Sequence, residues 1–201
     1  MFIQIIQGIC HDADALRRQT DTWREEVAPK ATGWLGGTYG VTDDHRFIGV
    51  VRFESSQAAA RNSATPEQDA WWSVTKKAFD GEVSFHDCDE VTTLLDGGSD
   101  QAGFVQVIQG RVSDPRRHSA FASQPMDRLR QARPEVIGGT LAMDPSGFLT
   151  QTMAFTSEDA ARRGESQEMP EDLRASFDEE MSQIKDLTYL DLRHPWFSSR
   201  T

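Results

Sequence analysis

The chain has 201 residues, which is enough to bury a sizeable core without disulfides or structural metals. Its formal charge of −11 argues against a nucleic-acid partner, because such a partner requires a basic surface that neutralises phosphates. Two cysteines without a CxxC pair fit a reduced compartment, and no run of about eighteen apolar residues marks a membrane span. We therefore expect a cytoplasmic protein without membrane association.

The first half of the chain predicts the element order strand, helix, strand, strand, helix, strand. A helix is expected from the N-cap Asp12 or Asp14 to about Lys30, and Ser55 is expected to cap a short helix. Thr65, followed by Pro66, predicts a second start that carries the helix to about Phe79. The strands are predicted from short apolar runs bounded by turn residues. They are Phe2–Cys10, Trp34–Val41, Phe47–Phe53 and Val83–Val91.

The second half repeats the first. The segment FIQIIQG, which begins at Phe2, returns as FVQVIQG 102 positions later, and the GGT triplet that begins at Gly36 returns at Gly138. The same shift pairs Asp12 with Asp114, Phe53 with Phe155, Ser55 with Ser157, Ala58 and Ala59 with Ala160 and Ala161, and Arg61 with Arg163. The chain is therefore predicted to contain two copies of one βαββαβ unit.

A βαββαβ unit places both helices on one face of its sheet and leaves the other face to be covered. The second copy can cover it, so the fold class predicted is α+β, with two fused ferredoxin-like units forming a pseudo-symmetric barrel of the dimeric type. We expect the first unit at residues 1–95, a flexible linker at 96–102 and the second unit, with a C-terminal tail, at 103–201. Because one chain supplies both halves, it should be competent as a monomer, while association into a homodimer stays open.

The pattern resembles the dimeric α+β barrel superfamily, in particular its antibiotic-biosynthesis-monooxygenase-like (ABM) branch, in tandem single-chain form. The resemblance rests on the element order, the duplicated first strand, and the phrases FESSQAAARNS and FTSEDAARRGE. It covers almost the whole chain and is specific for the fold. Members of the superfamily include cofactor-free oxygenases of aromatic polyketides and haem-degrading enzymes, so the fold alone does not select an activity.

Residues that only one copy carries are the candidates for function. Asn62 is matched by Gly164 and Arg52 by Ala154, while nothing comparable matches the pair Trp71 and Trp72. The resemblance implies that an Asn and a Trp line a pocket and orient a phenolic substrate, and hydrogen-bond donors there would stabilise a developing anion. The predicted catalytic residues are Asn62, Trp71 and Arg52, and the predicted substrate-binding residues are Trp72, Tyr39, Gln4 and Gln7.

Several of these residues also have structural explanations. Trp72 lies at helical spacing from Phe79, which fits an ordinary core position. Asn62 is equally suited to a helix C-cap, because Asn tolerates the left-handed conformation. Arg52 could pair with one of many acids. Gln4 and Gln7 are repeated in the second unit, which favours a hydrogen-bonded seam between the two sheets over ligand contact.

Three functions are therefore open. The first is a cofactor-free monooxygenase acting on a small aromatic or polyketide-like compound, and the second is a barrel that binds a small molecule without chemistry. The third is haem binding or degradation, which the position of His86 on the closing strand weakens. No His falls at metal-ligand spacing with another ligand, so we expect no metal site and no cofactor.

Overall fold

The computed structural model describes residues 1–123, 126–168 and 170–199, and the chain forms two compact units. The first contains Met1–Asp89 together with the segment from His194 onward, and the second contains Glu90–Arg193. Among the described residues, no helix combines the length and the apolar character needed to cross a bilayer.

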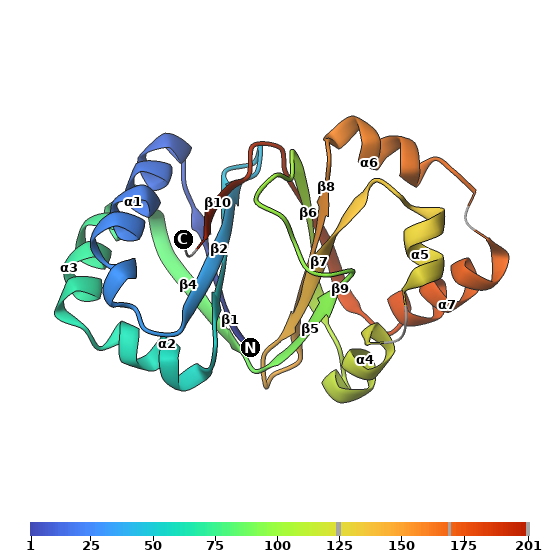
Figure 1. The fold of residues 1–201 in the computed structure, drawn as a ribbon, viewed down its shortest axis with the longest axis horizontal. Coiled ribbons are helices and arrows are strands. Elements are labelled where there is room, and N and C mark those ends of the chain that lie inside the picture. Colours follow the sequence, from blue (N-terminus) through green and yellow to red (C-terminus); the bar gives the residue numbers. More distant parts are fainter. Residues whose placement is uncertain (124–125, 169, 200–201) are drawn as a thin grey trace. The chain divides into compact units, whose positions relative to one another are not determined.

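In the first unit, three helices cover one face of a five-stranded antiparallel sheet with the order β10-β2-β3-β1-β4 (Figure 1). The strands are β1 (Phe2–Ile9), β2 (Trp34–Val41), β3 (Arg46–Phe53), β4 (Asp80–Cys88) and β10 (Trp196–Ser199). The helices are α1 (Ala13–Glu26), α2 (Ser56–Ser63) and α3 (Pro66–Thr75), with short 3₁₀ turns at Ala28–Lys30 and Lys76–Ala78.

The helices begin where the sequence predicts. The side chain of Asp12 accepts a hydrogen bond from the backbone N–H of Ala15 at 2.8 Å, and that of Ser55 accepts one from Ala58 at 3.2 Å. Each cap satisfies one of the N–H groups that a helix start leaves without an intrahelical partner. The helix that follows Pro66 ends at Thr75 rather than at the predicted Phe79, because its last turn tightens into a 3₁₀ turn.

Strand register assigns each side chain to one face of the first sheet. Phe2 pairs with Phe53, and both belong to the aromatic core beneath the helices. Ile3 and Ile5 alternate with Phe2 along β1 and therefore point to the opposite face, which we call the outer face. The core beneath the helices also contains Trp23, Trp34, Tyr39, Phe47 and Trp196.

The second unit repeats this arrangement with the strand order β5-β7-β8-β6-β9 and its helices on one face (Figure 1). The strands are β5 (Glu90–Leu94), β6 (Phe104–Arg111), β7 (Val136–Met143), β8 (Phe148–Phe155) and β9 (Lys185–Leu192). The helices are α4 (Pro115–Ala122), α5 (Asp127–Ala132), α6 (Glu158–Glu165) and α7 (Glu171–Met181). The predicted α+β class and the two βαββαβ units are confirmed, while closure of the two sheets into a barrel stays a prediction.

Two edge strands differ from the sequence-based expectation. The single strand predicted at Val83–Val91 is two strands, because β4 ends at Cys88 and β5 begins at Glu90 in the other sheet. The C-terminal tail, for which no strand was predicted, forms β10 and pairs with β2. The predicted boundaries at residues 95 and 103 follow the repeat, whereas each compact unit takes its outermost short strand from the other side of those boundaries.

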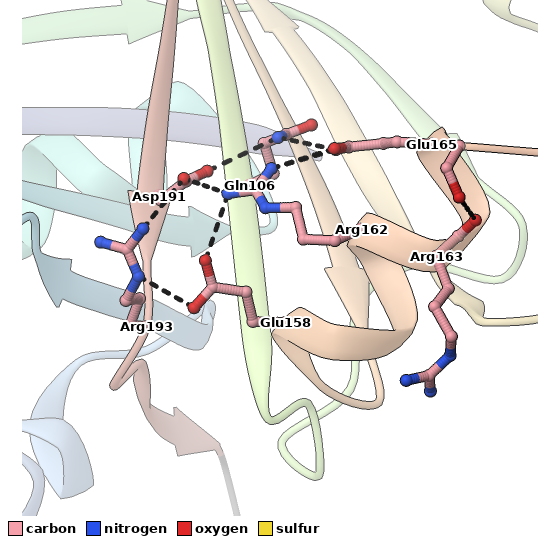
Figure 2. Close-up of polar contacts among 8 residues, drawn as sticks. Gln106, Glu158, Arg162, Arg163, Glu165, Asp191 and Arg193 are labelled. Carbon is pink, nitrogen blue, oxygen red and sulfur yellow. Dashed lines mark hydrogen bonds and ion pairs between the residues drawn. The ribbon is translucent and has the colours of Figure 1, made fainter.

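A network of charged side chains ties α6 to β9 in the second unit (Figure 2). Arg162 lies at its centre, and its guanidinium carbon is 5.3 Å from the ring centroid of Phe104. The hydrogen bond from Arg193 lowers the pKa of Glu158, so this carboxylate stays ionised further into the acid range. Arg162 contacts Glu158 at 3.3 Å, Glu165 at 3.1 Å and Asp191, and Arg193 contacts Glu158 at 2.8 Å and Asp191 at 3.6 Å.

The first unit has no equivalent of this network, because Ala60 occupies the position of Arg162. What both units keep is a glutamine on the first strand bonded to an aspartate on the neighbouring strand. Gln4 donates to Asp87 at 2.9 Å, and Gln106 donates to Asp191 at 3.5 Å. Gln106 also donates to Glu165 of α6 at 3.2 Å, so both amides have partners within their own unit rather than in the predicted seam between the sheets.

Substitution of Arg162 by Ala should lower the free energy of unfolding by about 1 kcal/mol, because a cation with three carboxylate partners and an aromatic contact is lost. Arg163→Ala is the matched control, since its side chain points away from the network (Figure 2). Urea denaturation at low salt measures both. Equal values for the two variants would contradict a stabilising role for the network.

Candidate ligand site in the first unit

Three tryptophans from different elements meet in the helix-side core of the first unit. Trp23 of α1 packs edge-on against Trp34 of β2, with ring centroids 4.8 Å apart. The ring of Trp71 in α3 also contacts Trp23 edge-on, with ring centroids 6.4 Å apart. Aromatic rings favour edge-to-face contacts of this kind, so the three rings pack together as one cluster. We call Trp23, Trp34 and Trp71 the tryptophan cluster.

A glutamine on α3 connects this cluster to Asn62. The Oε1 atom of Gln68 accepts a hydrogen bond from Nε1 of Trp23 at 2.6 Å and another from Nδ2 of Asn62 at 3.1 Å. Gln68 lies in the first turn of α3, where Thr65 caps its backbone N–H at 3.2 Å. The Thr65 hydroxyl donates in turn to the carbonyl of Asn62 at 2.8 Å. Asn62 is thereby held at both its backbone and its side chain.

Two buried polar atoms at this site have no hydrogen-bond partner among the described residues. They are Oδ1 of Asn62, an acceptor, and Nε1 of Trp34, a donor. The exposed fractions of these residues are 7% and 2%. Leaving a buried polar group unpaired costs about 1–3 kcal/mol, so such atoms need an explanation. The acceptor can take a hydrogen bond from a ligand hydroxyl, and the donor can give one to a ligand oxygen.

Asn62 is not the helix cap that its residue type also suggested. It lies inside α2, which ends at Ser63, and it is not among the residues with positive φ. Its burial and its unpartnered oxygen are therefore not explained by a turn conformation. The unpartnered Oδ1 atom of Asn62 is therefore a candidate ligand contact.

The two tryptophans of α3 have structural partners. Nε1 of Trp71 donates to the carbonyl of Gln19 at 2.7 Å, so this N–H is already used. Trp72 packs against Phe79 at 6.1 Å and Phe85 at 5.4 Å. These contacts fit the core position that helical spacing also indicated for Trp72. The ring of Trp71 belongs to the tryptophan cluster, but the buried indole N–H without a partner among the described residues is that of Trp34.

Tyr39 lies on the helix side of the sheet in a separate aromatic stack. Its ring lies 6.1 Å from that of Trp196 and 6.4 Å from that of Phe47. Complete burial raises the pKa of the Tyr39 hydroxyl well above its ordinary value, against a smaller opposing effect of Arg52. A side chain at Gly37 would meet the Tyr39 hydroxyl at 2.0 Å, so this stack requires a glycine there.

The structure does not bring all of the predicted residues together. Arg52 pairs with Ile3 in the sheet and so points to the outer face, where it donates to Thr38 at 2.9 Å. Gln7 points to the same outer face, because it alternates with the helix-facing residues of β1. Gln4 faces the helices but is bonded to Asp87. Asn62 and Trp71 thus share one site, and the strands of the sheet separate them from Arg52 and Gln7.

Sequence reasoning missed Trp34, Trp23 and Gln68. The comparison of the two copies carried the signal for Trp34, because Val136 stands at its position in the second unit. Gln68 had no such signal, since the register between the copies slips beyond Ser63.

Solved structures show which proteins share this fold. A "putative monooxygenase" from Lactobacillus acidophilus NCFM superposes with a TM-score of 0.71 at 14% identity, covering 95% of this chain and 92% of that one. An anthrone oxidase-like protein gives a TM-score of 0.64 at 10% identity, covering 100% and 91%. A ferredoxin-fold protein related to antibiotic biosynthesis monooxygenases, from Listeria monocytogenes 4b F2365, gives 0.52 at 8% identity, covering 100% and 95%.

These similarities confirm the predicted resemblance at the level of the fold. The chain shares the fold of these three structures over nearly its full length. No family model matches the sequence, and no curated protein matches it. At such low identities the shared fold does not transfer an activity.

Two buried tryptophans with opposite hydrogen-bond status test whether the Trp34 donor is unpaired. Nε1 of Trp196 donates to the Thr20 hydroxyl at 2.9 Å, whereas Nε1 of Trp34 has no partner among the described residues. Both Trp→Phe changes remove similar apolar area, but only Trp196→Phe breaks a bond. Trp196→Phe should therefore lower the free energy of unfolding by about 1 kcal/mol more than Trp34→Phe in urea titrations. The opposite order would show that Trp34 is satisfied in solution.

Proposed function

We propose that the first unit binds a small aromatic compound with an acidic hydroxyl or an enolisable carbonyl, and oxidises it with molecular oxygen without a cofactor. The observation that carries the proposal is the pair of unpartnered buried atoms, Oδ1 of Asn62 and Nε1 of Trp34, beside the tryptophan cluster. A ligand hydroxyl would satisfy both atoms and place an aromatic body against the indole rings.

The chemistry needs a substrate that reacts with oxygen once it has lost a proton. Asn62 Oδ1 accepts the hydrogen bond of the substrate hydroxyl and orients it, and the Trp34 N–H donates to the oxygen on which negative charge grows. In an anthrone-like substrate, the activated methylene loses two hydrogens and gains one oxygen atom. The second oxygen atom leaves as water, so the substrate itself supplies the electrons.

The fold gives this proposal its context. Structures of the same tandem architecture include a protein described as anthrone oxidase-like, and anthrone is a compound of the proposed substrate class. The low dielectric of a site lined by tryptophans strengthens hydrogen bonds to a developing anion. The proposal concerns the first unit alone, because Gly164 and Val136 replace Asn62 and Trp34 in the second.

A non-catalytic binding protein is the second candidate, and the same pair of unpartnered atoms supports it. Haem is less well supported, because its two candidate contacts are separated. Trp71 lies on the helix side with its N–H bonded to Gln19, whereas His86 pairs with Ile5 in the sheet and points to the outer face. A Soret shift on titration with haemin would favour haem binding instead.

Oxygen consumption with anthrone as the probe tests the oxygenase proposal. Wild type should oxidise anthrone above the buffer rate, and Trp34→Phe should lower kcat by about 100-fold, as expected when one anion-stabilising donor is removed. Asn62→Ala should lower kcat/KM, because the substrate loses its orienting acceptor. Arg163→Ala, a change in the second unit, is the control and should keep the activity.

The outcomes separate the candidates. Equal rates for wild type, both site variants and buffer would contradict the oxygenase. If anthrone quenches the tryptophan fluorescence of the wild type but not of Asn62→Ala, while oxygen consumption stays at the buffer rate, the site binds without catalysing oxidation. Absence of both binding and turnover would remove the proposed substrate class.

A further inference from the structure

The second unit contains a cavity of about 280 Å³ between α4 and α7. It lies on a different unit from the tryptophan cluster and shares no residue with it. This volume is close to the lower end of the range of small-molecule sites, which suits a compact ligand. The residues that line it are Arg117, Ala120, Phe121, Ser176, Glu179 and Glu180.

One carboxylate in this lining is buried beside a buried histidine. Glu180 is 7% exposed, and it forms a pair with His118, which is equally buried. Nδ1 of His118 lies 3.6 Å from Oε2 of Glu180, which is too long for a hydrogen bond, and this nitrogen has no other partner in the described part of the chain. The His118 nitrogen is therefore unsatisfied, and its nearest charged neighbour is the Glu180 carboxylate.

Among the described residues, no Lys or Arg is paired with Glu180. Burial lowers the pKa of His118, against a smaller opposing effect of Glu180, so the imidazole is neutral at pH 7 and above. Arg117 is engaged by Glu179 at 3.7 Å, and both of these side chains are largely exposed. A buried carboxylate without a paired cation is costly, which means that a cation entering the cavity would bring a large gain.

Comparison of the two copies shows that this pair is specific to the second unit. Leu16 stands at the position of His118, and it is a fully buried core residue of α1. Thr75 stands at the position of Glu180 when Trp72 is matched with Phe177, and it is bonded to the carbonyl of Trp71 at 3.0 Å. A fold that is stable with Leu and Thr does not need a buried His and Glu there, so the pair calls for another role.

We infer that the cavity between α4 and α7 binds a small organic cation, namely a primary ammonium group attached to an apolar or aromatic body. The ammonium donates to the Glu180 carboxylate, and the body lies against Phe121 and Ala120, which line the same cavity. Desolvated charge-assisted hydrogen bonds are strong, and an aromatic face adds a cation–π attraction. This site is independent of the proposed oxidation in the first unit.

Isothermal titration with benzylammonium at pH 8 tests the inference, with benzyl alcohol and benzoate as neutral and anionic probes of similar shape. Wild type should bind benzylammonium and bind the other two at least tenfold more weakly. Glu180→Gln should weaken benzylammonium at least tenfold, because it removes the charge and keeps the side-chain volume. Glu179→Gln is the matched control, since this neighbouring carboxylate lines the same cavity but is exposed, and it should change the affinity by less than about twofold.

A second variant guards against loss of folding. Glu180→Asp keeps the charge and should retain the preference for benzylammonium over benzyl alcohol, even if its affinity falls. Near-ultraviolet circular dichroism checks that each variant keeps its tertiary packing. The inference is overturned if wild type does not bind benzylammonium, if the three probes bind alike, or if Glu179→Gln and Glu180→Gln weaken binding equally.

Discussion

The position of α1 on the first sheet is the constraint on which the tryptophan cluster depends, and one hydrogen bond from the C-terminal strand helps to fix it. Trp196 of β10 donates to Thr20, which is one of the buried residues of α1. The preceding residue of α1, Gln19, accepts a hydrogen bond from Trp71 at its carbonyl. One helical turn further along α1, the indole N–H of Trp23 donates to Gln68. The geometry around Asn62 is therefore transmitted from β10 through α1 to α3, and no single element could provide it.

Much of the fold follows from the sequence because its signals are local. The caps at Asp12 and Ser55, the proline at Pro66 and the duplicated first strand each act within a few residues. The positions of β5 and β10 could not be predicted in this way. These strands have only five and four residues, and the sequence pattern of such short segments does not indicate which sheet edge they pair with. For the same reason, the sequence did not predict that one strand ends and another begins on either side of Asp89.

The candidate site was predictable only in part. Asn62 was predicted because Gly164 replaces it, and the same comparison would have singled out Trp34. Arg52 was grouped with Asn62 because β3 is apolar on both faces, so its sequence shows no alternation that would separate the sides of the sheet. Only the register with β1 places Arg52 on the outer face. His118 and Glu180 lie far apart in the chain, and a lone His on a helix gives no sign of its partner.

The route of the chain through the two sheets has a consequence for the order of events during synthesis. Domains generally fold in sequence as they leave the ribosome, the N-terminal one first. In this chain the first sheet receives its fifth strand from residues 196–199, after the whole second unit has been made. Until then the edge of β2 lacks its partner and Thr20 lacks Trp196. Residues up to 199 must leave the ribosome before the site in the first unit can take its final form.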